Sequence, residues 1–217
     1  MIVNRTDTIG VFQFEDTVNT SDNGGTNGTV TGTTAYVDTI SGKGFDFDGS
    51  SRVSIGNSSL SNSSNITALL RMNLDTHTTN DKIFAKRSTA NGNGFYLYIA
   101  SSGGDVIRFR CRNAADSTWV AAELVMPETI PYAIRCEINL GTEITLSYYT
   151  IDGAFTTTTT AFTDSTYATN TDNINIGDFE SGGQGMDGSI DDFTIIEGLI
   201  SDEDFYRYYL GMGITDL

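Results

Sequence analysis

The chain has 217 residues, with 28 acidic against 12 basic residues, and its formal net charge is -16 at pH 7. This charge argues against nucleic acid and against an anionic membrane surface as the partner. No run of about 18 apolar residues is present, so no membrane insertion is expected. No Pro-rich or Ser/Gly-rich linker divides the chain, which favours one domain over residues 1–217.

Apolar and polar residues alternate in short segments along nearly the whole chain, which is typical of half-buried strands. The first expected strand is Ile9 to Phe14, and the polar run from Asp16 to Thr34 is expected to form a long surface loop. The stretch from Gly42 to Ile55 predicts a hairpin-like unit of two strands. In it Phe45 and Phe47 alternate with aspartates before a Gly-Ser-Ser turn.

Eight more segments are expected to be strands, with turn residues between them. They are Ile66 to Leu74, Gly94 to Ala100, Asp105 to Arg112, Thr118 to Val125, Pro131 to Leu140, Glu143 to Ile151, Asn173 to Gly177 and Gly188 to Ile196. The Thr tract from Thr156 to Thr160 favours an edge strand or an extended loop. Ser201 and the three acidic residues after it have the pattern of a helix start. The chain therefore predicts an all-β fold, a two-sheet antiparallel jelly-roll sandwich with one short C-terminal helix.

If Gly94 to Ile151 forms one meander, the side chains opposite the core gather on one sheet face. These side chains are Tyr96, Tyr98, Arg108, Arg110, Arg112, Trp119, Glu123, Arg135, Glu137 and Tyr149. Aromatic rings can stack on sugar rings, and Arg can hold carboxylate or sulfate groups with two hydrogen bonds, which favours an anionic polysaccharide.

The predicted ligand-binding residues on this face are Tyr96, Tyr98, Arg108, Arg110, Arg112, Trp119 and Arg135. In the alternative interpretation, the aromatic side chains pack under loops or against a neighbouring subunit, and each Arg pairs with an acidic neighbour. If the face binds nothing, the loops from Asp16 to Thr34 and from Asp178 to Asp187 are the next candidates.

The two cysteines, Cys111 and Cys136, both occupy core-facing positions of expected strands. Within one meander they would lie two strand spacings apart, roughly 9 to 10 Å, which is too far for a disulfide. We expect two free, buried and unreactive thiols. His77 is the only histidine and has no second His or Cys near it in sequence, which argues against a metal site there.

Four motifs occur in the chain in a fixed order. They are GFDFDG from Gly44 to Gly49 with Val53 and Ile55, YTIDG from Tyr149 to Gly153, INIG from Ile174 to Gly177, and GSIDDFTI from Gly188 to Ile195 followed by LISDE from Leu199 to Glu203. This series resembles the signatures of the laminin-G-like (concanavalin A-like lectin/glucanase) jelly-roll superfamily and covers almost the whole chain. The family's usual Trp-x-His-Val before the second motif is missing, and IPYAI from Ile130 to Ile134 stands in its place.

Members of that superfamily include glycan-binding modules, receptor-binding and adhesion modules, virion surface proteins and glycanases. The glycanase branch has a Glu-x-Asp-x-Glu strand that supplies the two catalytic carboxylates. That motif does not occur here, and neither does an evident Ser/His/Asp or Cys/His set, so no enzyme is expected. The resemblance implies a non-catalytic carbohydrate- or receptor-binding surface module, from a bacteriophage virion surface or an adhesin. The alternative is a structural virion component, a capsid decoration or fibre protein, without glycan binding.

The expected partner is a cell-surface or extracellular polysaccharide, or other virion proteins, and a homo-oligomer is an open alternative. The N-terminal residues lack the basic and apolar regions of a signal peptide. Either a signal peptide was removed, or the protein is released by lysis with a virion. We therefore expect a virion surface, with the extracellular space or the cell surface as the alternative.

The resemblance and the apolar match of the two segments also predict that Ile9 to Phe14 pairs antiparallel with Gly188 to Ile196. Asp16 and Asp191 share the parity of core-facing residues in these strands, and the pairing brings them together. Two inward carboxylates need a shared proton, backbone N–H donors or a hard cation. Calcium sites are common in this superfamily, so Asp16 and Asp191 are the predicted ligands of a structural Ca2+. The alternative is that hydrogen bonds in turns satisfy both carboxylates.

Overall fold

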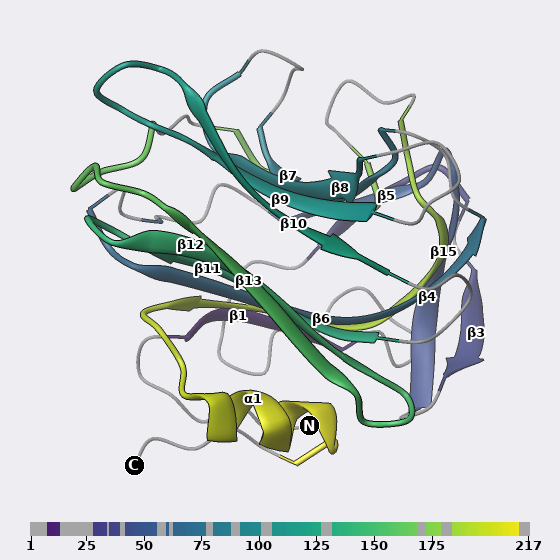
Figure 1. Cartoon of the computed structure of the whole chain (residues 1–217). Coiled ribbons are helices and arrows are strands. Elements are labelled where there is room, and N and C mark those ends of the chain that lie inside the picture. Colours follow the sequence, from purple (N-terminus) through teal and green to yellow (C-terminus); the bar gives the residue numbers. More distant parts are fainter. Residues whose placement is uncertain are drawn as a thin grey trace.

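The computed structural model describes residues 8–13, 28–33, 35–39, 42–55, 60, 63–76, 80–87, 92–100, 106–126, 132–168, 172–178 and 184–212. These residues form two antiparallel sheets that face each other, with one helix outside (Figure 1). The all-β sandwich of jelly-roll type predicted from the sequence is confirmed.

The eight-stranded sheet has at its centre β15 (Asp187–Glu197), which pairs with β6 (Ile66–Thr76) on one side and with β4 (Gly42–Asp48) and β1 (Thr8–Gln13) on the other. Beyond β6 follow β11 (Tyr132–Asn139), β12 (Glu143–Thr150) and β13 (Phe155–Ala161), and beyond β4 lies β3 (Tyr36–Thr39). The pairing of the first strand with the last is confirmed, since the backbone of Phe12 lies opposite that of Phe193.

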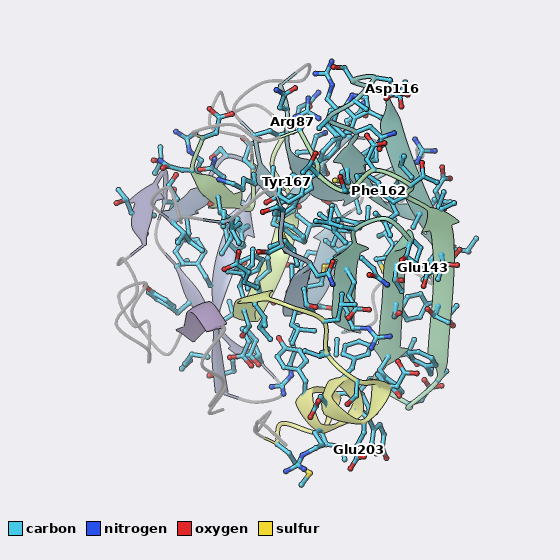
Figure 2. All side chains as sticks on the ribbon, turned by 90° about the vertical axis from the view of Figure 1, so that its left-hand side faces the viewer. Arg87, Asp116, Glu143, Phe162, Tyr167 and Glu203 are labelled. Carbon is cyan, nitrogen blue, oxygen red and sulfur yellow. The ribbon has the colours of Figure 1, made fainter. Side chains whose placement is uncertain are left out.

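The seven-stranded sheet has the order β10 (Trp119–Val125), β9 (Val106–Arg112), β8 (Phe95–Ile99), β7 (Lys82–Lys86), β14 (Ile174–Ile176), β5 (Arg52–Ile55) and β2 (Thr29–Thr31). The core lies between the two sheets, where the apolar residues of each alternating strand face one another. Phe84 of one sheet meets Phe193 of the other edge to face, with ring centroids 5.3 Å apart. Phe162 and Tyr167, from the segment after β13, fill the same layer (Figure 2).

Helix α1 (Asp202–Tyr209) covers part of the outer face of the eight-stranded sheet (Figure 1). Its start is as predicted, because the Ser201 hydroxyl accepts a hydrogen bond of 3.0 Å from the Asp204 N–H. Phe205 and Tyr208 are buried against a small apolar cluster that includes Leu69 and Ile196. In the described part of the chain, no helix is long and apolar enough to cross a bilayer.

The hairpin predicted from Gly42 to Ile55 is wrong in one respect. Both strands exist, but β4 belongs to the eight-stranded sheet and β5 to the seven-stranded sheet, so the turn between them is a corner of the sandwich. The Asp48 carboxylate accepts hydrogen bonds from the N–H groups of Ser50 and Ser51 and fixes this corner. Alternation could not distinguish the two arrangements, because both sheets present the same inward pattern to one core.

The meander predicted over Gly94 to Ile151 is also wrong. Strands β8, β9 and β10 form one end of the seven-stranded sheet, whereas β11 lies between β6 and β12 in the other sheet. Cys111 and Cys136 therefore stand in opposite sheets, and both are free and buried as predicted. The separation expected for two strands of one sheet therefore does not apply to the two thiols.

Three strands were missed, namely β2, β3 and β7. The first of these lies within the segment predicted as a loop from Asp16 to Thr34, of which residues 16–27 and 34 are outside the described residues. The loop prediction is therefore wrong for Thr29–Thr31. His77 also lies outside the described residues.

Gly188 lies in β15 at a position where a side chain would collide with the backbone of β6. Its φ is +146°, and an added Cβ would lie 2.3 Å from the backbone oxygen of Asn73 in β6. Gly141 is a matched control, since its φ is +74° but nothing lies within 4 Å of an added Cβ.

We expect Gly188→Ala to lower the free energy of unfolding by about 3 kcal/mol, because β15 and β6 must move apart, and Gly141→Ala to cost only about 1 kcal/mol of backbone strain. Urea denaturation measures both values. Equal losses in the two variants would contradict the tight packing of β15 on β6.

Candidate functional site

The outer face of the seven-stranded sheet carries a set of basic and aromatic side chains at its β7 to β10 end. We call it the basic-aromatic face, and it comprises Lys82, Arg87, Tyr96, Tyr98, Arg108, Arg110, Arg112 and Trp119. Strand register brings them together, because Tyr96 lies opposite Arg110, Tyr98 opposite Arg108, and Trp119 opposite Arg112. Six of the seven predicted ligand-binding residues thus share one face.

The two tyrosines hold two of the arginines. The Arg108 Nη1 donates a hydrogen bond of 2.7 Å to the Tyr98 hydroxyl, and the Arg110 Nη1 donates one of 3.2 Å to the Tyr96 hydroxyl. The tyrosine rings pack on each other at 4.9 Å and are themselves buried. Tyr96 and Tyr98 therefore fix the positions of the guanidinium groups rather than offering open ring faces.

Trp119 is partly exposed and is surrounded by guanidinium groups. Its ring meets Tyr96 edge to face at 5.3 Å. The Cζ atoms of Arg87, Arg110 and Arg112 lie 4.9, 5.3 and 5.8 Å from its ring centre. Such cation–π contacts hold the indole in a fixed orientation between positive charges.

The face concentrates positive charge in an acidic protein. Five of the 12 basic residues of the chain lie on it: Lys82, Arg87, Arg108, Arg110 and Arg112. Glu123 lies opposite Arg108 and forms an ion pair with it at 2.7 Å. The other two predicted arginines, Arg110 and Arg112, are partly exposed and contact rings on the same surface.

Arg87 and Lys82 were missed by the sequence analysis. They are 1% and 3% exposed, and both contact the tyrosine rings from the β7 side, Arg87 over Tyr96 at 4.3 Å and Lys82 over Tyr98 at 5.1 Å. Burial, with Arg87 adding repulsion, lowers the pKa of Lys82 to about 8, and burial also lowers the pKa of Arg87. The short segment KIFAKR contains both residues but has no clean alternation, so no face could be assigned to them.

Arg135 does not belong to this face, which corrects the prediction. It stands on the outer face of the eight-stranded sheet beneath α1 and is 4% exposed. Its guanidinium lies 3.3 Å from Glu137, 2.7 Å from Asp202, and 4.9 Å from the ring centre of Phe205. Glu137 and Tyr149, which the meander placed beside Trp119, lie near α1 with it. The cause is the sheet change between β10 and β11.

The carboxylates predicted to bind calcium are described only in part, because Asp16 lies outside the described residues. Asp191 lies where β15 and β6 shift register, and its Oδ2 is 4.0 Å from the Arg71 Nη1. Asp192 approaches the same nitrogen at 3.1 Å. Within the described residues, no three His, Cys, Asp or Glu side chains form a group able to hold a metal ion. Calcium at Asp16 and Asp191 remains a prediction.

The motifs noted in the sequence agree with a match to a family model. The model described as "Concanavalin A-like lectin/glucanases superfamily" matches residues 47–204. The chain belongs to this superfamily. No curated protein is similar enough to this chain to count as a match.

Several solved structures have a similar fold. Domain 4 of AbnA, an extracellular arabinanase of Geobacillus stearothermophilus solved with arabinotriose, is 16% identical with a TM-score of 0.65, and the match covers 92% of this chain and 96% of that domain. The binding domain of Paraclostridial Mosquitocidal Protein 1 is 11% identical with a TM-score of 0.71, covering 94% of this chain and 52% of that one. The receptor binding domain of botulinum neurotoxin D is 15% identical with a TM-score of 0.68, covering 94% and 52%. This chain thus spans about half the length of the two toxin domains.

Arg135 supplies the counter-charge of a buried carboxylate, that of Glu137. Burial raises the pKa of Glu137, and Arg135 opposes that shift. We expect Arg135→Met to lower the free energy of unfolding at pH 7 by about 3 kcal/mol, because a buried carboxylate loses its counter-charge. Without Arg135 the pKa of Glu137 rises further, so Glu137 is protonated as the pH falls toward 5 and the loss becomes smaller.

Urea denaturation at pH 7 and pH 5 measures this effect, and Arg112→Met on the basic-aromatic face is the control, with an expected loss below about 1 kcal/mol. A loss for Arg135→Met that is equally large at both pH values would contradict the role assigned to Glu137.

Proposed function

We propose that this protein is a non-catalytic carbohydrate-binding module and that the basic-aromatic face is its binding surface. The observation that carries the proposal is the partly exposed Trp119 flanked by Arg110 and Arg112 on an otherwise acidic protein. An indole can stack on the apolar face of a sugar ring, and the arginines beside it can bind carboxylate or sulfate groups. An anionic glycan fits this combination better than a neutral one.

The buried part of the face supports the same function. Tyr96 and Tyr98 restrict the side chains of Arg110 and Arg108, so less conformational entropy is lost when a ligand binds. Arg87 adds positive charge below the surface, which attracts an anion without direct contact, whereas Asp81 and Asp178 offset part of the charge of Lys82. We assign Trp119, Arg110 and Arg112 to direct contact and the two tyrosines to positioning.

The chemistry of the chain and its structural neighbours favour binding over catalysis. The sequence has no Glu-x-Asp-x-Glu strand. Burial raises the pKa of the thiols of Cys111 and Cys136 well above the ordinary value, which leaves them protonated and unreactive. The similar structures include a domain solved with arabinotriose and toxin binding domains. A place outside the cell, on a cell surface or a virion surface, would give the face access to such glycans.

Binding to sugar polymers tests the proposal. The probes are dextran sulfate and polygalacturonate, with neutral dextran as the sugar control and polyphosphate as the control for charge alone. The parent protein should bind at least one of the two anionic sugar polymers more tightly than polyphosphate. Trp119→Ala and Arg110→Ala should each weaken that binding about fivefold or more, which is ~1 kcal/mol.

Arg207→Ala, on α1 beyond the other sheet, is the matched control and should bind as the parent does. Isothermal titration calorimetry measures affinity, and circular dichroism confirms folding. Folded Trp119→Ala and Arg110→Ala proteins with the parent's affinity would place the site elsewhere.

A further inference from the structure

Strands at the edge of a sheet expose backbone N–H and C=O groups that can pair with another chain, and proteins usually protect them. Besides β1, whose side chains are outside the described part, four strands end the two sheets here: β13 and β3 in one, β10 and β2 in the other. Three of these four edges are protected in recognisable ways.

The edges at β2, β3 and β10 are short, charged or covered. Strand β2 has three residues. Strand β3 has four, and its Asp38 forms an exposed ion pair with Lys43. The open edge of β10 receives side chains from the opposite sheet, because the Thr160 Oγ1 donates to the Ala121 oxygen at 2.7 Å and the Tyr148 hydroxyl to the Val125 oxygen at 2.8 Å.

Strand β13 has none of these protections. Its seven residues, FTTTTTA, include no charge, proline or glycine, and its pairing with β12 has no register shift. Figure 1 shows it along the outside of the sandwich, and the described part of the chain supplies no strand on its other side. A long, regular and uncharged open edge is the kind that pairs with another strand.

The backbone direction along β13 can be derived from the hydrogen bonds at its two ends. The Thr150 N–H donates to the Ala154 oxygen, and the Phe162 N–H donates to the Thr142 oxygen. The even-numbered residues of β13 therefore bond to β12. Because bonding direction alternates along an antiparallel strand, Phe155, Thr157, Thr159 and Ala161 turn their N–H and C=O groups to the open edge.

We propose that β13 pairs antiparallel with β13 of a second copy of this chain, about a two-fold axis at Thr158. In this register Thr157 lies opposite Thr159 of the other copy, and Phe155 lies opposite Ala161. All four belong to the outward-bonding set, so each opposed pair exchanges two backbone hydrogen bonds. The ring of Phe155, which is 40% exposed, would cover the small Ala161 side chain.

The absence of charge on β13 favours a second copy as the partner. Across a two-fold axis, a segment at the contact lies opposite the same segment of the other copy. In a protein with a net charge of -16, most surface segments would then bring like charges together. Residues 153–163 carry no charge, and threonine pairs across strands are favourable.

An apolar patch continues the contact area beyond β13. It comprises Phe155 and Tyr206, which are 40% and 47% exposed, with the ring of Tyr149 between them. Ring contacts of 4.8 and 5.6 Å join Phe155 and Tyr206 to Tyr149, so the patch begins where the strand begins. Exposed apolar area of this kind is typical of protein interfaces.

The dimer has a consequence for binding. An axis perpendicular to the joined eight-stranded sheets leaves both seven-stranded sheets on the same side. The two basic-aromatic faces would then point the same way and could bind one polymer together, which raises avidity. The dimer itself does not depend on the proposed function, because it can form without a ligand.

Sedimentation velocity over a range of protein concentrations tests the dimer without any ligand. The parent should sediment with twice the mass of one chain. The double variant Thr157→Lys with Thr159→Lys sets lysines against lysines and should be monomeric, with at least a tenfold weaker association. Ala114→Lys with Ala115→Lys, on an exposed turn, changes the net charge equally and should remain dimeric.

A second variant and a measurement on the parent keep the test decisive if the lysine variant does not fold. Thr159→Pro removes one outward N–H and no bond to β12, so it should be folded and monomeric. Hydrogen exchange on the parent should show slow amides at Thr157 and Thr159 at high concentration and fast ones on dilution. The proposal is overturned if the parent is monomeric or if a folded lysine or proline variant still dimerises. It is also overturned if the exchange rates of the Thr157 and Thr159 amides do not depend on protein concentration.

Discussion

The pairing of β15 with β6 is the contact on which the rest of the structure depends. The two strands form the centre of the eight-stranded sheet, and β15 holds β1 and β4 along its other side. Since β15 comes near the end of the chain and β1 near its start, the sheet cannot close until nearly all residues are present. Helix α1 follows β15 directly and packs on the outer face of the same sheet. In the described residues, the outer face of the other sheet receives no helix.

This asymmetry gives the two outer faces different chemistry. On the eight-stranded sheet, Arg135 and Arg71 are enclosed beside α1 and pair with Glu137, Asp202 and Asp192. On the seven-stranded sheet, Arg110 and Arg112 lie over Trp119 and are partly exposed. Arg135 and Arg71 thus stabilise the fold on one side, whereas Arg110 and Arg112 are presented to solvent on the other. Figure 2 shows Arg87 near one end of the molecule and Glu203 of α1 at the opposite end.

Much of the fold could be predicted because the period of two fixes which side chains face the core. It placed Tyr96, Tyr98, Arg108 and Trp119 correctly on an outer face. It could not assign strands to sheets, since the same pattern serves either layer of a sandwich, and Arg135 was misplaced for that reason.

Irregular register caused the other errors in the site. Strand β7 shifts register between Lys82 and Phe84, so the alternation that would have revealed Lys82 and Arg87 is broken. Strand β15 shifts between Ile190 and Phe193, and Asp191 therefore approaches Arg71, contrary to its simple parity with Phe193. Such shifts depend on the neighbouring strand and are not visible in one segment of sequence.

The location of the ligand is tested most directly by nuclear magnetic resonance on 15N-labelled protein titrated with a sulfated oligosaccharide. If the basic-aromatic face binds it, the Trp119 indole N–H, the Nε–H groups of Arg110 and Arg112 and the amides of β9 and β10 should shift with one common affinity, while the amides of α1 stay unchanged. Shifts confined to α1 or to the loops, with the Trp119 indole unmoved at saturation, would contradict the assignment of this face as the binding surface.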